Sequence, residues 1–161
     1  ERVTLHDAND ARAVQLSASL RAAGLDARIG TAEQAACSEI VVAATRSSVP
    51  VLRGAALRPG SFVASVGATR PDQRELDDEC VVRASHVIVD AREQTIEESG
   101  DFQLLAPEVL ANTRILDLSD VLANPPTFDP AAGPVVYKAV GNALQDAALA
   151  ALAFRKLGQR E

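Results

Sequence analysis

Short apolar segments alternate with helical segments along the whole chain, and this alternation constrains the fold more than any other feature. Residues 39–45 form an unbroken run rich in β-branched residues, which is typical of a parallel strand covered on both faces. Alternating strands and helices predict an α/β fold with a parallel sheet and helices on both of its faces. The other strands are expected at 2–6, 27–29, 61–67, 86–90, 115–117 and 135–138.

Capping residues and breakers mark the helices between these strands. Asn9 or Asp10 is suited to cap a helix over 11–23, which Gly24 ends. Thr31 and Gln34 form a capping-box pattern that opens a helix of about two turns. A proline-rich loop is expected at 124–134. Further helices are expected at 75–84, 93–99, 107–110 and 142–157.

Composition and charge restrict the function class. The chain has 161 residues and a net charge of −6, so it lacks the basic balance expected of a nucleic-acid-binding protein. No apolar run reaches the roughly 18 residues of a membrane span, and no secretory signal is recognisable. We therefore expect a cytoplasmic protein that binds neither nucleic acid nor membrane.

The few cysteines and histidines argue against a metal site. Cys37 and Cys80, with His6 and His86, lack the spacing of a four-ligand zinc site and cannot build a disulfide framework. Both cysteines lie in helical segments and are expected to be buried, reduced thiols. Both histidines lie in or beside strands and are expected to be structural.

The beginning of the chain favours a piece of a longer protein. The sequence contains no methionine and opens with Glu1-Arg2-Val3, although a processed chain could begin in the same way. Residues 1–161 are long enough for one domain. We expect a missing strand and a glycine-rich turn upstream of Glu1.

In a parallel α/β sheet, ligands bind beyond the carboxyl ends of the strands, so residues just after each strand are the candidates. Asp7 could accept hydrogen bonds from an adenosine ribose, or it could be a turn aspartate that caps the next helix. Thr45 could pass close to a nicotinamide ribose, or it could simply end a strand. Gly67 allows a close backbone approach, although a plain turn also explains it.

Several strings of residues carry a resemblance to a known family. They are 61–79 (SFVASVGATRPDQRELDDE), 98–101 (ESGD), 40–46 and 137–146, together with Val89-Asp90 and 51–54. The chain resembles the ornithine cyclodeaminase/mu-crystallin family over nearly its whole length. It is more similar to the mu-crystallin and ketimine-reductase side of the family than to true cyclodeaminases.

The resemblance implies the nicotinamide-binding, Rossmann-like domain of a two-domain homodimer, a doubly wound parallel sheet that lacks its first strand and glycine-rich turn. The other domain, outside this chain, would carry the dimer interface and the substrate anchors. Glu98 and Val140 would face a small amino-acid-like or imine substrate. The implied cofactor-binding residues are Asp7, Thr45, Val63, Ala64, Ser65, Val66, Gly67, Gln73 and Ala139.

Two positions depart from the family pattern. Cyclodeaminases carry an acid/base aspartate where this chain has Thr69, and a threonine hydroxyl has no useful pKa near neutrality. Ala139 stands where many members have a serine, which removes one hydrogen bond to the cofactor. The first departure argues against cyclodeamination.

These features together predict a function and two alternatives. The chain is expected to be the NAD(P)-binding domain of an imine (ketimine) reductase or amino-acid dehydrogenase that acts by hydride transfer. A cofactor- and ligand-binding protein without turnover and an ornithine cyclodeaminase are the alternatives. The Asp7 carboxylate favours NAD over NADP, and the segment alone is expected to be inactive.

Overall fold

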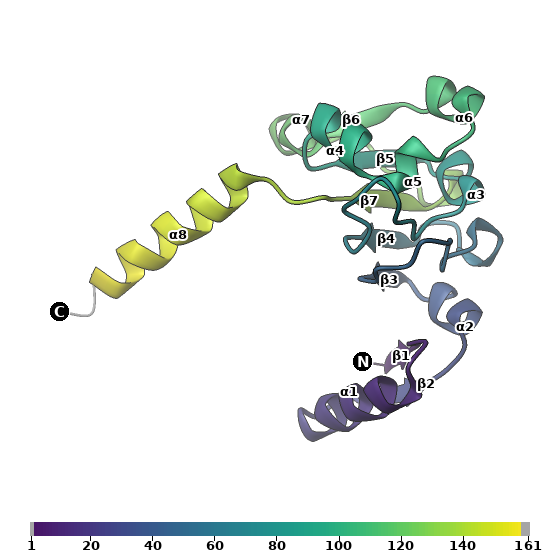
Figure 1. The fold of residues 1–161 in the computed structure, drawn as a ribbon, viewed down its shortest axis with the longest axis vertical. Coiled ribbons are helices and arrows are strands. Elements are labelled where there is room, and N and C mark those ends of the chain that lie inside the picture. The colour runs from purple at the N-terminus through teal and green to yellow at the C-terminus, as the bar shows by residue number, and fades with distance from the viewer. Residues whose placement is uncertain (1, 159–161) are drawn as a thin grey trace.

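A computed structural model describes residues 2–158 of the protein. Its centre is a five-stranded parallel sheet with the strand order β3-β4-β7-β5-β6 (Figure 1). The predicted α/β class with parallel strands is confirmed. The strands are β3 (Ile40–Ala43), β4 (Phe62–Ser65), β5 (His86–Val89), β6 (Ile115–Asp117) and β7 (Val135–Lys138).

The first two strands form a second, separate parallel sheet. β1 (Arg2–Leu5) pairs with β2 (Asp26–Ile29), and the helix α1 (Asp10–Ala22) contacts β2. The short helix α2 (Ala32–Ala36) leads from this unit to the larger sheet (Figure 1). The seven strands of residues 2–158 are thus divided between two sheets.

The expected caps of the first two helices are confirmed. The side chain of Asn9 accepts hydrogen bonds from the backbone N–H groups of Ala11 and Arg12. Thr31 and Gln34 complete the capping box at the start of α2. These side chains satisfy backbone donors that have no partner within a helix.

The strand β3 is covered on one face only, so the expectation of burial on both faces is wrong for it. Val41 and Ala43 are buried and pack with Ala36 of α2. Ile40 and Val42 point the other way and are 69% and 67% exposed. β3 is an edge strand of its sheet, and α1 packs on β2 instead of on this face.

The helix predicted over 75–84 begins three residues later than expected. Leu76 forms an isolated parallel bridge with Leu52, so its backbone is extended, and Asp77 then caps the helix α3. Two short helices, α5 and α7, were missing from the sequence-based expectations. The helices along this stretch are α3 (Asp78–Val82), α4 (Arg92–Glu98), α5 (Gly100–Gln103), α6 (Pro107–Asn112) and α7 (Leu118–Ala123).

Two hydrophobic clusters hold the larger sheet and its helices. One centres on Val63 and Val136 of the sheet and includes Cys80, whose burial raises the pKa of its thiol. The second centres on Val89 and includes Phe102. The expectation that Cys37 is buried is wrong, because this residue ends the short helix α2 at the surface.

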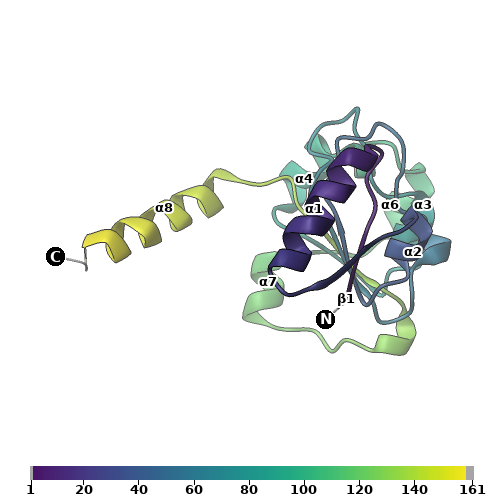
Figure 2. The same ribbon diagram turned by 90° about the horizontal axis from the view of Figure 1, so that it is seen from below.

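The last helix, α8 (Ala143–Gly158), extends away from the rest of the molecule (Figures 1 and 2). None of its residues is buried, and Leu144 and Phe154 are each 79% exposed. Across residues 2–158, no helix combines the length and the apolar character needed to cross a membrane. The apolar side chains of α8 therefore lie at the surface of the described structure.

Candidate functional site

The carboxyl ends of the parallel strands bring most of the candidate residues to one edge of the larger sheet. Thr45 lies just beyond β3, Gly67 and Thr69 beyond β4, and Ala139 and Val140 beyond β7. The backbone N–H of Ala139 donates to the carbonyl of Ser65 (3.1 Å), which joins the ends of β4 and β7. This edge is where α/β sheets bind ligands.

One buried carboxylate, that of Glu75, joins the ends of β3 and β4. Its Oε1 accepts a hydrogen bond from the backbone N–H of Thr45, and its Oε2 accepts one from the backbone N–H of Gly67 (2.9 Å). The hydroxyl of Ser65 also donates to Oε2 (2.7 Å). The side chain of Glu75 is fully buried. The sequence predicts Glu75 at the start of a helix and does not indicate this role at the strand ends.

These contacts determine the charge state of Glu75. Burial alone raises the pKa of the Glu75 carboxyl, but hydrogen bonds from Ser65 and from the backbone of Thr45 and Gly67 lower it by more. The net pKa lies below the ordinary value of 4.5, so the group is ionised at neutral pH.

A buried ion pair lies next to Glu75 and contacts its backbone and its partner Ser65. Lys138 Nζ lies 3.0 Å from Asp101 Oδ2, and it also donates to the hydroxyl of Ser65 (3.3 Å). The other oxygen of Asp101 accepts the backbone N–H groups of Glu75 (2.7 Å) and Leu76 (2.8 Å). Both charged side chains are at most 1% exposed.

A second carboxylate, Asp90, holds the segment after β7. Its oxygens accept the backbone N–H groups of Val140 (3.2 Å) and Gly141 (2.8 Å) and the hydroxyl of Thr95 (2.7 Å). Asp90 lies just beyond β5, so it connects the end of that strand to the end of β7.

Glu98, the expected substrate-side residue, lies near the same segment. The amide of Gln94 donates to Glu98 Oε2 (3.3 Å) and to the carbonyl of Gly141 (3.1 Å). Gln94 therefore links Glu98 to the segment that contains Val140. The carboxylate of Glu98 is at the surface, at the end of α4.

Two glycines permit close packing of the loops at this edge. A β-carbon at Gly67 would overlap the backbone of Thr45, and one at Gly100 would overlap the carbonyls of Pro71 and Gln73. The backbone N–H of Gly100 donates to the carbonyl of Arg70 (3.0 Å). Gly67 is thus required by contacts within the protein, whether or not a ligand approaches it.

A small polar hollow of about 240 Å³ opens at this edge. The backbone N–H of Thr69 donates to Gln73 Oε1 (3.3 Å) at its wall. Two arginines and no carboxylate are among the residues that line this hollow. Its lining residues are Arg46, Gly67, Thr69, Arg70 and Gln73.

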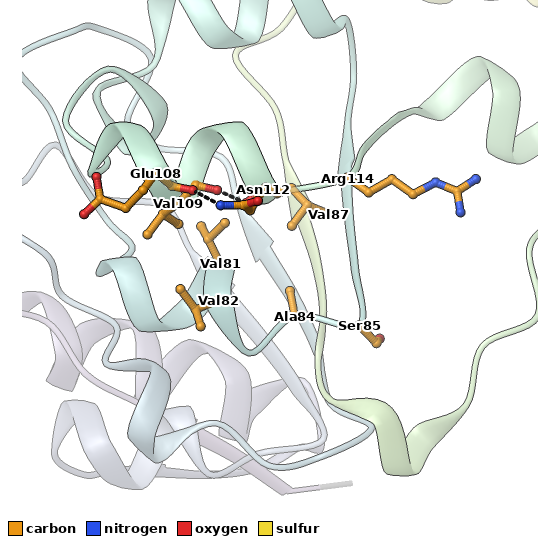
Figure 3. A pocket seen from close by; sticks show the side chains of 10 residues that line it. Val81, Val82, Ala84, Ser85, Val87, Glu108, Val109, Asn112 and Arg114 are labelled. Carbon is orange, nitrogen blue, oxygen red and sulfur yellow. Dashed lines mark hydrogen bonds between the residues drawn. The ribbon is translucent and has the colours of Figure 1, made fainter.

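A larger hollow of about 480 Å³ lies at the opposite edge of the sheet (Figure 3). Ser85, which precedes β5, and Arg114, which precedes β6, are among its lining residues. Val81 and Val82 of α3 line it from one side, and Val109 of α6 from the other (Figure 3). Because it lies at the amino ends of the strands, it is separate from the candidate site.

The remaining candidate residues fall into two groups. In the run 63–66, the side chains of Val63 and Ser65 are buried, Ala64 is half-buried and Val66 is 40% exposed, so the side chains of Val63 and Ser65 cannot face a ligand. Asp7 lies beyond β1, on the smaller sheet, where Oδ1 accepts the backbone N–H of Asn9 (2.7 Å). Asp7 therefore belongs to the smaller sheet and not to the strand-end edge of the larger one.

Comparison with known proteins decides the family. The sequence model of the ornithine cyclodeaminase/mu-crystallin family matches residues 1–160. The chain belongs to this family. The ketimine reductase mu-crystallin of Mus musculus is 33% identical over 133 residues, which is 80% of this chain and 40% of the mouse protein.

Solved structures of the family have the same fold. A probable ornithine cyclodeaminase from Bordetella pertussis Tohama I superposes with a TM-score of 0.86 and 40% identity, over 100% of this chain and 52% of that one. The Δ1-pyrroline-2-carboxylate reductase of Thermococcus litoralis, in complex with NADH and L-proline, superposes with a TM-score of 0.89 and 27% identity, over 99% of this chain and 51% of that one. This member of the ornithine cyclodeaminase/mu-crystallin family thus spans about half the length of both.

The ion pair leads to a stability prediction. Replacing Lys138 by methionine leaves Asp101 and Glu75 buried without a cation, which should lower the free energy of unfolding by about 3–5 kcal/mol. The chain has one other lysine, Lys156, which is exposed on α8 and provides the matched control. Urea denaturation measures the free energy of unfolding of Lys138→Met and Lys156→Met. Equal values for the two variants would contradict the role assigned to the Lys138–Asp101 ion pair.

The lowered pKa of Glu75 leads to a pH prediction. At pH 7, Glu75→Gln should be less stable than the unaltered protein by about 1–3 kcal/mol, because an amide replaces one acceptor oxygen. As the pH falls below about 4.5, the unfolded chain takes up a proton at Glu75 more readily than the folded protein does, so this contribution declines, whereas the variant does not titrate there. The difference in the free energy of unfolding should therefore narrow toward pH 3. A difference that stays constant from pH 7 to pH 3 would show that ionised Glu75 contributes nothing.

Proposed function

We propose that this chain is the nicotinamide-dinucleotide-binding domain of an imine reductase that transfers hydride to the carbon of a C=N group. The observation that carries the proposal is the convergence of Thr45, Gly67, Thr69, Ala139 and Val140 at one sheet edge of a chain that belongs to this family. A mouse relative is named a ketimine reductase, and the Thermococcus litoralis reductase was solved with NADH.

The residues at this edge fit a dinucleotide in their chemistry. Val66 and Thr69 are exposed there, and the backbone around Thr45 and Gly67 is held by a carboxylate on its inner side, which leaves the outer side open. The chain contains no Gly-x-Gly-x-x-Gly fingerprint for the pyrophosphate. Strands β1 and β2 form a sheet of their own, separate from the five-stranded sheet that carries these residues.

We therefore also propose that residues 1–161 form one domain of a two-domain protein. The chain covers 40% of the mouse relative and about half of the two solved structures described above. On family grounds, we also propose that the complete protein is a cytoplasmic homodimer formed through the other domain. Light scattering of the complete protein measures its oligomeric state.

The isolated chain should bind cofactor weakly and turn over no substrate.

A nicotinamide cofactor would supply the hydride, so the chain's own part is binding and orientation. Thr45, Gly67, Gln73 and Ala139 would hold the cofactor, and the backbone of 63–66 would line it. Val140 and Glu98 would face the substrate. The hydroxyl of Thr69 can orient a nitrogen by a hydrogen bond, but it cannot serve as an acid or base near neutral pH.

Two other functions give different results in the same assay. The Bordetella pertussis structure, named a probable ornithine cyclodeaminase, favours ornithine as a substrate, whereas a binding protein without turnover would hold cofactor only. The complete protein is incubated with NADH and a cyclic imine carboxylate, and with NAD and ornithine or alanine. If the protein oxidises NADH with the imine and does not convert ornithine or alanine, the proposal is supported. Absence of turnover with every substrate would refute it.

The choice of cofactor depends on Asp7 in this proposal. Its carboxylate should repel a 2′-phosphate, so the complete protein is expected to bind NADH more tightly than NADPH. Asp7→Asn removes the charge and should narrow the ratio of the two dissociation constants, while Asp10→Asn on α1 serves as control. Fluorescence titration measures the ratio, and tighter binding of NADPH by the unaltered protein would show the assignment to be wrong.

Thr69 distinguishes imine reduction from cyclodeamination. Ornithine conversion needs a base beside the reacting nitrogen, whereas an iminium substrate can arrive already protonated from solvent. The complete protein should form negligible proline from ornithine, and Thr69→Asp should raise any such activity by about 10²–10⁴-fold. Thr69→Asn, which is similar in size and does not titrate, is the control. Rapid proline formation by the unaltered protein would show that another group moves the proton.

A further inference from the structure

Glu75 contacts two strand ends at once. Its two oxygens accept backbone N–H groups from Thr45, beyond β3, and from Gly67, beyond β4. Neighbouring parallel strands are normally held together by their ladder, which here ends at the pairing of Ala43 with Ser65. Beyond that point, the carboxylate takes over the link between the two strands.

The arrangement requires a carboxylate and not merely a polar side chain. Three donors meet the side chain, namely the N–H groups of Thr45 and Gly67 and the hydroxyl of Ser65. Only an ionised carboxylate presents acceptors on both oxygens. A glutamine of the same size would turn an NH₂ group toward one of the two backbone donors and leave that donor buried without an acceptor.

The backbone of Glu75 is fixed as firmly as its side chain. Asp101 accepts the N–H group of Glu75 (2.7 Å), and Lys138 of β7 pairs with the other oxygen of Asp101. Lys138 also donates to Ser65, which in turn donates to Glu75. The positions of Thr45 and Gly67 therefore depend on a closed, buried network of Ser65, Glu75, Asp101 and Lys138, with exposures of 0%, 0%, 1% and 0%.

We propose that Glu75 is a positioning residue, which sets the spacing of the β3 and β4 ends and so shapes the surface that receives the nicotinamide half of the cofactor. This inference rests on the proposed function. Glu75 lies on the inner side of that surface and is fully buried, so it acts through Thr45 and Gly67 and does not touch the ligand. Its loss should weaken cofactor binding in molecules that remain folded.

A purely stabilising role would give a different result. It would lower the melting temperature and leave the dissociation constant of the folded fraction unchanged. Val87→Ala is the matched control, since Val87 is 2% exposed in the second hydrophobic cluster and contributes no group to the strand-end edge. Both variants lose stability, but only Glu75→Gln alters the spacing of the strand ends.

The experiment compares the complete protein with its Glu75→Gln and Val87→Ala variants. NADH is titrated by fluorescence, and hydrogen exchange is followed by mass spectrometry. Glu75→Gln should weaken NADH binding at least tenfold and speed exchange in peptides covering 44–48 and 66–70. Val87→Ala should bind NADH within twofold of the unaltered protein, with slow exchange kept in both peptides.

The possible outcomes are separable. If the unaltered protein does not bind NADH, the proposed function fails. If it binds and Glu75→Gln binds equally well, or Val87→Ala loses as much affinity, the positioning role is overturned. Should Glu75→Gln fail to fold, Ser65→Ala removes one donor to the carboxylate and decides the question. A several-fold loss of affinity in Ser65→Ala supports the role, and NADH binding equal to that of Val87→Ala overturns it.

Discussion

The hydrogen bonds to the carboxylate of Glu75 are the interaction on which the arrangement of the strand ends depends. Backbone N–H groups beyond the last ladder pair need acceptors when they are shielded from water, and the loops themselves supply none for Thr45 and Gly67. Burying a carboxylate is costly unless donors surround it. Here three donors and the nearby Lys138–Asp101 pair offset that cost, so the charge can remain inside the protein.

The sequence predicts the elements of this fold far better than it predicts this network. Local patterns suffice for the strands and for the caps at Asn9 and Thr31, because those interactions join residues that are close in the chain. Glu75 follows a turn and precedes further acidic residues, so its neighbours suggest the exposed start of a helix. Its partners Asp101 and Lys138 lie 26 and 63 positions away, and no local pattern connects them.

One signal in the sequence could have revealed part of the network. Lys138 ends an apolar strand in the middle of the sheet order, where a lysine needs an anionic partner if it is buried. The apolar run at β3 predicts a buried strand, but it does not show which element covers each of its two faces. Ile40 and Val42 are exposed because the helix nearest in sequence, α2, packs on the other face.

The composition of the projecting helix α8 favours a helix even without contacts to the rest of the protein. Six of its sixteen residues are alanine, Asp146 lies in its first turn and Arg155 and Lys156 lie in its last, all of which favour a helix by itself. An isolated helix of this length is still marginal in water. A surface that receives its leucines and Phe154 would therefore select a conformation that is already partly populated. The loss of chain entropy on docking would then be smaller than for a segment that must fold from a random coil.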